Sequence, residues 1–479
     1  MNAVLVMTFL IPFAGGAMAF LPNASWQRFI ALVATAATAA AVGLLAAQVL
    51  ASGAQTYPVG GWMAPLGIHL RCDGLSLLML LLTAVIGVGT SLFSLAYFAG
   101  ETKGAISTGI FWPLWLFLWG GMNCLFLSGD LFNLYLLLEL TLLASVAMAS
   151  LGGSNAAMVS ALRYLLAATA AAMFYLLGVA LLYSEFSTLD ILGLKAAMST
   201  GYLPLLALGL MVGGLALKCA LFPLHFWLPA AHSTAPAPVS ALLSAVVVKC
   251  GFYVIMRIWL DIFPTTAPDA AGQLMAVLGA AAVVWGSWQA LRQDRLKMLI
   301  AYSTVAQIGY LFLLFPLIGD AEQEVRSATT YQIISHGLAK AGMFLAAGTL
   351  VRTARSDLLT DTRGAFRKAP FAVVAIMISG AALAGLAPGG GAKGNLIGIA
   401  MDAGQWWWVV VIAVGILLTV AYTIRAVRHS FQSMPEPEKK LGTGVRWLEG
   451  PALALAILSI VASLYSKNWL ALLEIGFPP

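Results

Sequence analysis

Charged residues are scarce in this chain. Asp, Glu, Lys and Arg make up 9% of its 479 residues, whereas hydrophobic residues make up 61%. A soluble domain carries about 25% charged residues, so the composition excludes a protein that covers a globular surface with hydrated side chains. Apolar runs of about 20 residues, the length of a membrane-spanning helix, recur from end to end. The sequence therefore predicts an all-α polytopic membrane protein.

Cysteine and histidine, common ligands of metals and clusters, are also few. The four cysteines form no C-x-x-C pair and the five histidines form no H-E-x-x-H motif, so neither zinc nor iron–sulfur ligation is predicted. The stretch "GGGAKGN" lacks the order of a phosphate-binding loop. We expect no cofactor and no metal. The net charge of +6 is interpreted as a topology signal, and no nucleic acid is expected as a partner.

The hydrophobic runs predict about fourteen transmembrane spans. The seventh and the twelfth are interrupted. The expected spans cover residues 3–21, 27–51, 74–99, 106–128, 130–150, 160–183, 203–228, 237–263, 272–292, 296–317, 328–351, 370–402, 406–430 and 450–470.

Lysine and arginine are divided unevenly between the two sides of these spans. The loops that follow odd-numbered spans hold most of them, whereas the opposite side, to which Arg257 and Arg326 are assigned, is richer in acids. Positively charged loops stay in the cytoplasm. Both termini are therefore expected on the outer side of the membrane, which we take to be the bacterial cytoplasmic (inner) membrane.

A few ionisable side chains fall inside the spans, where charges are costly and usually mark ion pathways. An isolated lysine can instead snorkel to the interface, but Lys218 lies too far from the ends of its apolar run. His232 suits a polar helix cap as well as a proton relay. His336 and Lys340 share one helix face because they are four residues apart. The candidate relay residues are Glu139, Lys218, His232, Lys249, His336, Lys340 and Lys393.

Two of these lysines lie beside predicted helix breaks. Pro223 follows Lys218 and removes a helical hydrogen bond. The stretch "APGGGAKGN", with Pro388, Gly390 and Gly391, adjoins Lys393. Freed carbonyls at membrane depth are tolerated where they line a wet cavity or meet protein partners. Two broken spans that each carry a lysine suggest an internal repeat and point to the ion site.

The acid and the first lysine predict a gated proton transfer. A carboxylate close to a desolvated lysine favours the protonated lysine. We therefore expect Glu139 and Lys218 to lie within reach of an ion pair. When that pair opens, Lys218 can lose its proton to a neighbour such as Lys249.

Several motifs resemble one family of membrane proteins. It comprises the antiporter-like subunits of respiratory complex I, those of membrane-bound hydrogenases, and the A and D subunits of Mrp-type Na+/H+ antiporters. The resemblance covers nearly the whole chain and rests on "DGLSLLML" (Asp73–Leu80), "GDLFNLYLLLEL" (Gly129–Leu140), "LKCALFPLHFWLPAAHSTAPAPVSALLSAVVVKCGFYVIMR" (Leu217–Arg257), "DRLKMLIAYSTVAQIGY" (Asp294–Tyr310) and "ISHGLAKAGMFLAAG" (Ile334–Gly348).

The resemblance implies a domain organisation. Fourteen helices would include two inverted five-helix repeats, with the seventh and twelfth helices discontinuous. Residues 1–105 would form the first three helices, 106–263 the first repeat, 272–430 the second, and 431–479 a cytoplasmic loop and the last helix.

The resemblance also implies roles for individual residues. Glu139 matches the glutamate of the fifth helix, and Lys218 matches its lysine partner on the seventh. Lys249 matches the relay lysine of the eighth helix. His336 and Lys340 match polar positions of the eleventh.

The twelfth helix departs from the family pattern. The family usually reads P-P-x-x-G-F-x-x-K, but this chain reads "APGGGAKGN", so Lys393 comes two positions early and Asn395 stands at the usual place. The exit site toward the outside is therefore either displaced to Lys393 or altered in kind.

The expected function is proton or H+/Na+ translocation within a multisubunit membrane complex, with other membrane subunits, the lipid bilayer and the transported ions as partners. A role like that of the D subunit of an Mrp-type antiporter is favoured by "ISHGLAKAGMFLAAG" and "AQIGY". A pumping subunit of a redox-driven complex, a proton-conducting partner of an inorganic-carbon uptake complex and a non-conducting scaffold are the alternatives. The chain is not expected to be an enzyme on its own.

Overall fold

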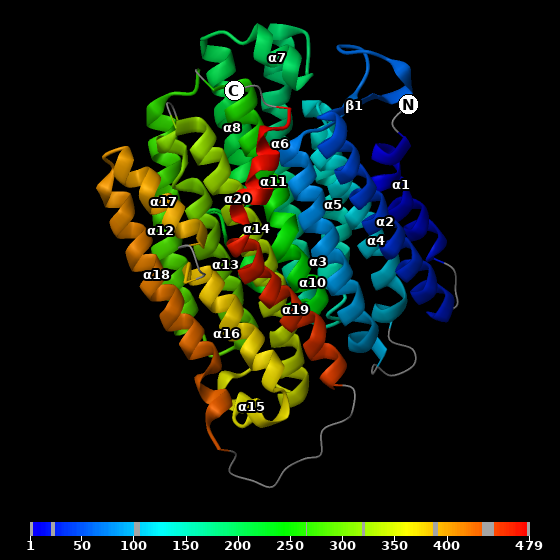
Figure 1. The fold of residues 1–479 in the computed structure, drawn as a ribbon, viewed down its shortest axis with the longest axis vertical. Helices are drawn as coiled ribbons and strands as arrows, with labels where there is room; N and C mark the ends of the chain where they lie inside the picture. The colour runs from blue at the N-terminus through cyan, green and yellow to red at the C-terminus, as the bar shows by residue number, and fades with distance from the viewer. Residues whose placement is uncertain are drawn as a thin grey trace.

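The computed structural model describes residues 3–20, 24–99, 106–264, 266–318, 321–386, 391–433 and 445–476. These ranges are almost entirely helical, because a backbone in lipid must satisfy its hydrogen bonds internally. The long helices pack side by side into a bundle, with both chain ends near the same end of it (Figure 1).

Helical segments account for every predicted span. The first six are α1 (Ala3–Met18), α2 (Ala24–Ser52), α3 (Gly74–Ala99), α4 (Ile106–Leu127), α5 (Leu131–Ser150) and α6 (Asn155–Phe186). The later ones are α8 (Tyr202–Lys218) with α9 (Leu228–Thr234), α10 (Ala237–Leu242) with α11 (Val248–Met256), α12 (Asp269–Arg292), α13 (Leu296–Phe312), α14 (Glu322–Ala354), α16 (Pro370–Ala384) with α17 (Gly391–Asp402), α18 (Trp406–Val427) and α19 (Val445–Leu464). Short helices occur at α7 (Ile191–Ala197), α15 (Ala365–Lys368) and α20 (Ser466–Leu470).

Length and composition agree with a membrane bundle. Within the described residues, 11 helices are long and apolar enough to cross a membrane. Three shorter apolar helices, α1, α8 and α16, match the remaining predicted spans. The predicted all-α polytopic fold of about fourteen spans is confirmed.

The seventh span is discontinuous, as predicted. Helix α8 ends at Lys218, and α9 begins only at Leu228, with Pro223 between them. The indole Nε1 of Trp227 donates to the carbonyl of Leu217 at 3.0 Å. A protein side chain thus supports the backbone at the end of α8, as a non-helical segment at membrane depth requires.

The twelfth span is discontinuous as well. Helix α16 ends at Ala384, where Gly385 adopts a left-handed conformation with φ of 78°. Helix α17 then begins at Gly391. Of the residues predicted to break this span, Gly391 opens the second half, whereas Pro388 and Gly390 lie outside the described residues.

Capping residues shift some helix ends away from the hydrophobic run. The carboxylate of Asp130 accepts a hydrogen bond from Asn133 N at 2.7 Å and opens α5. The hydroxyl of Ser154 accepts from Ala157 N at 3.1 Å, so α6 begins at Asn155 rather than at residue 160. Such side chains satisfy backbone donors that a helix start leaves unpaired.

A two-stranded antiparallel sheet follows α2 and was not predicted. Its strands are β1 (Gln55–Pro58) and β2 (His69–Cys72), with Gln55 opposite Cys72 and Pro58 opposite His69. The sheet lies near α7 and both chain ends (Figure 1). This end of the bundle is called the hairpin end below, and the opposite end, where α15 lies, the α15 end.

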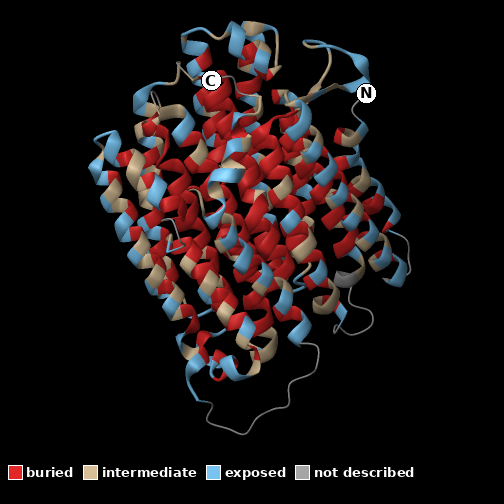
Figure 2. Ribbon diagram, viewed as in Figure 1, coloured by how far each residue is buried: buried red, intermediate tan, exposed pale blue. Residues whose placement is uncertain are grey.

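Helix α14 forms the centre of the bundle. Every residue in the most apolar 18-residue stretch of α14 is buried. In the corresponding stretch of the span formed by α10 and α11, 94% of the residues are buried. Buried residues fill the middle of the bundle, while exposed ones gather on its flanks (Figure 2). Ionisable side chains on α11 and α14 are therefore surrounded by protein rather than lipid.

Candidate functional site

The contact expected between Glu139 of α5 and Lys218 of α8 is present. Lys218 Nζ donates to Glu139 Oε1 at 2.8 Å. The lysine side chain is 8% exposed and the glutamate side chain 23% exposed. Lys218 is the last residue of α8, so the pair lies directly at the helix break.

A small cavity lies beside Lys218, among α5, α6, α8 and α11. Its volume is about 20 Å³, and its lining includes Lys218, Thr141, Tyr164 and Cys250. A cavity needs roughly 10–15 Å³ to hold a water molecule, so this one has room for a water among these helices. Cys250 directly follows Lys249 in the chain, so the cavity reaches the helix that carries Lys249, although Lys249 itself does not line it.

A chain of polar contacts joins Lys249 of α11 to Lys340 of α14. Lys249 Nζ donates to the carbonyl of Ser244, which lies in the π-helical turn η2 (Leu243–Val247). The hydroxyls of Ser244 and Thr304 are 2.9 Å apart. Thr304 Oγ1 donates to the carbonyl of Ile300 at 3.1 Å, and Lys340 Nζ donates to the same carbonyl at 3.1 Å. Three helices thus meet at a bridge between the hydroxyls of Ser244 and Thr304, and both lysines donate to backbone carbonyls beside it.

The two histidines are buried among these lysines. Within the described residues, neither ring nitrogen of His232 or His336 has a hydrogen-bond partner. The charges of Lys249, Lys340 and Lys393 all act on His336. His232 stacks on Phe344, with ring centroids 5.2 Å apart, and is fully buried. Among the described residues no hydrogen bond of ordinary geometry supports the interpretation of His232 as a polar cap, and its relay role stays a prediction.

Lys393, and not Asn395, enters the bundle from α17. Lys393 is 1% exposed, whereas Asn395 is exposed. The Lys393 Nζ lies 3.9 Å from the centroid of the Tyr310 ring. Of the two alternatives for the twelfth span, the structure therefore favours the displaced lysine over a site built on Asn395.

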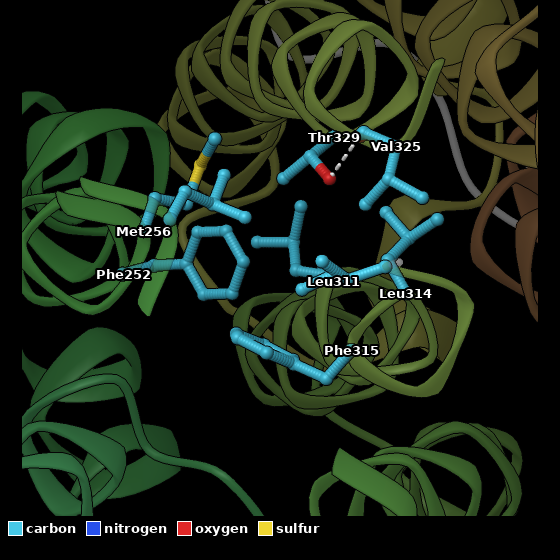
Figure 3. Close-up of a pocket in the computed structure, with 9 residues that line it drawn as sticks. Phe252, Met256, Leu311, Leu314, Phe315, Val325 and Thr329 are labelled. Carbon is cyan, nitrogen blue, oxygen red and sulfur yellow. Dashed lines mark hydrogen bonds between the residues drawn. The ribbon is translucent and has the colours of Figure 1, made fainter. Parts of the chain in front are cut away.

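Apolar side chains cover the lysines toward the hairpin end. They surround a cavity of about 10 Å³ lined by Phe252, Met256, Leu260, Leu311, Leu314, Phe315, Ile318, Val325 and Thr329 (Figure 3). On their helices these residues lie nearer the hairpin end than Lys249, Thr304 and His336. Thr329 Oγ1 donates to the carbonyl of Val325 at 2.7 Å, within its own helix (Figure 3). The cavity is at the lower limit for a single water, so this layer leaves little room for water on the hairpin side of the candidate relay residues. Of these residues, Glu139, Lys218, Lys249, His336, Lys340 and Lys393 are called the lysine row below.

A second buried charge cluster lies nearer the hairpin end and was not predicted from the sequence. Arg257 Nη2 donates to Asp73 Oδ1 at 2.6 Å, and its Nη1 donates to Asp261 Oδ2 at 3.0 Å. Arg326 Nη2 pairs with Asp261 Oδ1 at 3.3 Å. Both arginines are 6% exposed, so they lie inside the protein near the hairpin end rather than in an exposed loop. The i, i+4 spacing of Arg257 and Asp261 is the signal that could have shown their pairing.

This cluster adjoins a cavity of about 420 Å³ that is also lined by His69, Arg71 and Asp190. Burial alone would raise the pKa of Asp73. The charge and hydrogen bond of Arg257 outweigh burial and hold the pKa of Asp73 below its ordinary value. Asp73 is therefore a carboxylate at neutral pH, and its ion pair with Arg257 is formed.

Further polar side chains near the lysine row were not singled out from the sequence. Gln307 Nε2 of α13 donates to the hydroxyl of Tyr422 on α18 at 3.2 Å. Gln332 Nε2 of α14 donates to Gln307 Oε1 at 3.3 Å. Among the described residues no three His, Cys, Asp or Glu side chains gather as a metal site requires.

Comparison with known proteins places these residues in a family. Residues 128–419 match the family described as "NADH:quinone oxidoreductase/Mrp antiporter, TM". This chain belongs to that family. The match includes every residue of the lysine row, from Glu139 to Lys393, and confirms the resemblance seen in the motifs.

Relatives in the NADH:quinone oxidoreductase/Mrp antiporter family match most of the chain. The N subunit of NADH-quinone oxidoreductase from Desulforudis audaxviator is 34% identical, over 98% of this chain and 94% of its own length. The D subunit of the Na(+)/H(+) antiporter from Alkalihalophilus pseudofirmus is 31% identical, over 81% of this chain and 78% of its own length. A chain of the Mrp complex from Dietzia sp. DQ12-45-1b has a similar fold, with a TM-score of 0.89 at 24% identity, over 100% of this chain and 98% of that chain.

Proposed function

We propose that this chain is the proton-translocating subunit of a multisubunit cation/proton antiporter, comparable to the D subunit of Mrp-type complexes. The observation that carries the proposal is the row of buried ionisable side chains that runs from Glu139 to Lys393 across the bundle. The similarity to the D subunit of a Na(+)/H(+) antiporter supports the exchange of H+ for Na+. The chain would transport ions and would contribute no redox centre or chemical catalysis of its own.

The first step is the opening of the ion pair. While Glu139 holds Lys218 at 2.8 Å, the proton on Lys218 is stabilised by the carboxylate. When the pair separates, the charged Lys218 loses this stabilisation while it remains buried, so it releases its proton more readily. A water in the adjoining cavity would then carry the proton toward α11, the helix of Lys249, because Lys218 and Cys250 both line this cavity.

The second step crosses from α11 to α14. The bridge of Ser244 and Thr304 lies between Lys249 and Lys340, and its hydroxyls can both donate and accept hydrogen bonds. To pass a proton, each lysine would first turn from its backbone carbonyl toward one of these hydroxyls. His336 and Lys393 continue the path within electrostatic range of Lys340. Lys393 would then be the last station before release on the other side of the membrane.

We further propose that residues 106–263 and 272–430 are two five-helix repeats. In each range the fourth span is broken, as α8 with α9 and as α16 with α17. Each broken span carries a buried lysine next to the break, Lys218 at the end of a half-helix and Lys393 near the start of one. The remaining parts, 1–105 and 431–479, would flank the two repeats.

The proposed setting is a bacterial inner membrane, within a complex of other membrane subunits. The hairpin end, with both termini, would face outward, because the lysine- and arginine-rich loops lie at the α15 end. Protons and Na+ would be the transported ions.

A redox-driven proton pump is the second candidate. It is favoured by one observation, the 34% identity to the N subunit of an NADH-quinone oxidoreductase over 98% of this chain. In that case the same lysine row would move protons, and a separate module in the complex would supply the energy.

Everted membrane vesicles from cells that produce the whole complex separate the two candidates. ATP hydrolysis acidifies the vesicle interior, and a pH-sensitive dye then reports whether added Na+ releases protons. The antiporter proposal predicts Na+-dependent proton release that disappears when this chain is deleted. Failure of Na+ to release protons, together with acidification driven by NADH or another reductant through this complex, would favour the redox-driven pump.

Breaking the Ser244–Thr304 bridge is expected to slow transport without stopping it. Thr304→Val keeps the shape of the side chain but removes the hydroxyl, and one lost hydrogen bond of about 1 kcal/mol corresponds to a roughly five- to tenfold lower rate. Vesicle transport rates provide the measurement. Thr349→Val is the matched control, because Thr349 is equally buried but donates only to Leu345 O in its own helix. Equal rates in the two variants would contradict the bridge.

A further inference from the structure

The last lysine of the row has an unusual environment. Lys393 is almost fully buried, yet within the described residues its Nζ has no hydrogen-bond partner. A buried ammonium without compensation is strongly disfavoured. Among the described residues, the contact that can stabilise the charged form of this side chain is therefore not a hydrogen bond to an oxygen.

The aromatic ring of Tyr310 is the group placed to do so. Lys393 Nζ lies 3.9 Å from the centre of the ring, well inside the roughly 6 Å within which an ammonium is attracted to a π face. This attraction grows when the contact is desolvated, and Tyr310 is fully buried. The contact involves the ring face and not the hydroxyl.

The hydroxyl of Tyr310 does not explain why a tyrosine is buried here. Thr419 is close enough to influence it, but within the described residues it makes no hydrogen bond of ordinary geometry, although a buried tyrosine hydroxyl normally finds one. Removing it should therefore change little, because no well-formed hydrogen bond is lost. Removing the ring, in contrast, would leave Lys393 without its contact.

Helix α18 holds the ring in place through Gly415. A Cβ atom at residue 415 would lie 2.0 Å from Tyr310 Oη and 2.6 Å from Val283 Cγ1. Only a residue without a side chain leaves room for the tyrosine between α13 and α18. The packing of α18 thus fixes the position of the ring, and Gly415→Ala must displace it.

The titratable neighbours of Lys393 come from three helices. Its charge acts on His336 and Lys340 of α14. Tyr310 comes from α13, and Tyr422 of α18 lies within electrostatic range of Tyr310. The two groups on α14 repel a charged Lys393 whenever they are protonated, which increases the need for a stabilising contact.

We propose that Tyr310 is a positioning residue for ion transport, whose ring face binds the charged form of Lys393 and holds its ammonium inside the bundle. This inference rests on the proposed function, because it assigns a partner to Lys393, the last lysine of the proposed relay. Tyr310 itself neither accepts nor donates the transported proton.

The test compares transport at several pH values in vesicles that contain the whole complex. Tyr310→Phe keeps the ring and should retain the wild-type pH profile. Tyr310→Leu loses the ring. The decline of transport at alkaline pH should then occur at a pH about one unit lower, corresponding to the loss of one cation–π contact. Gly415→Ala should shift the profile in the same direction.

Two reference variants separate this inference from the proposed function. Phe312→Leu removes another fully buried ring from α13 and should leave the profile unchanged, while Lys393→Met should abolish transport. A wild-type profile in Tyr310→Leu, with transport lost in Lys393→Met, would overturn the inference and leave the relay intact. Wild-type transport in Lys393→Met would contradict the relay role of Lys393 itself. The amount of chain in the isolated complex shows whether each variant assembles.

Discussion

Lys218→Ala is expected to abolish cation-driven proton transport while the complex still assembles. The variant loses the first lysine of the row, next to the cavity through which the proton would pass. The remaining Glu139 carboxylate is 23% exposed, so it is not fully desolvated and its loss of a partner costs the fold less than in a dry core. Dye-monitored vesicle transport and the amount of chain in the purified complex provide the two measurements.

Lys218→Arg distinguishes proton transfer from simple charge pairing. A guanidinium can pair with Glu139 but stays charged at every accessible pH, so it cannot release a proton. The proposal predicts no transport for this variant. Lys467→Ala is the control, because Lys467 is exposed and lies outside the row. Substantial transport by Lys218→Arg or Lys218→Ala would mean that this lysine has a structural role.

Arg257→Ala is expected to destabilise the subunit far more than it impairs the lysine row. The guanidinium pairs with both Asp73 and Asp261. Removing it breaks two buried ion pairs and leaves the longer contacts of Asp73 with Arg71 at 3.7 Å and of Asp261 with Arg326 at 3.3 Å. Breaking a buried ion pair typically costs about 3–5 kcal/mol. Thermal unfolding of the complex in mild detergent should therefore occur at a clearly lower temperature. Arg257→Lys should rescue little, because a single ammonium cannot replace the two-pronged contact.

An exposed ion pair offers the matched control for this prediction. Arg295 and Asp357 are 3.4 Å apart, and the arginine side chain is 62% exposed. Exposed pairs contribute at most about 1 kcal/mol, so Arg295→Ala should leave the unfolding temperature nearly unchanged. A similar small effect in Arg257→Ala would show that the buried cluster does not stabilise the fold.

The same cluster predicts a dependence of stability on pH. The pKa of Asp73 is lower in the folded protein than its ordinary value, despite burial, because of Arg257. A lowered pKa stabilises the fold above the ordinary aspartate pKa of about 3.9, and this stabilisation is lost as the pH falls below it. Asp73→Asn should be less stable at neutral pH and should lose less stability between pH 5 and pH 3. Parallel curves for variant and wild type would contradict the pairing.

The sequence was sufficient to predict the architecture because hydrophobic length determines a membrane span. The third span, residues 74–99, was predicted with its observed ends. The eleventh was predicted as 328–351 but runs over Glu322–Ala354, because its ends carry acids and arginines that a hydrophobicity criterion excludes. The sheet of β1 and β2 was missed because four-residue strands leave no clear periodic signal.

The site could be predicted only in part. Glu139 is the one acid near the middle of a predicted span, so its pairing with Lys218 could be predicted from charge. The bridge from Lys249 to Lys340 could not be predicted, because Ser244 and Thr304 are ordinary residues of two apolar helices until the packing of η2 against α13 brings their hydroxyls within 2.9 Å. The environment of Lys393 likewise depends on Tyr310, which is distant in the sequence.

Lys249→Met is the most direct test of the central claim that the buried lysines form one proton path. Methionine is unbranched and fills a similar space without an ionisable group, so the bundle should assemble while the path is cut between Lys218 and Lys340. Reconstituted into proteoliposomes, the intact complex with this variant should show proton transport at background level. Transport near the wild-type rate would show that protons do not pass through the lysine row.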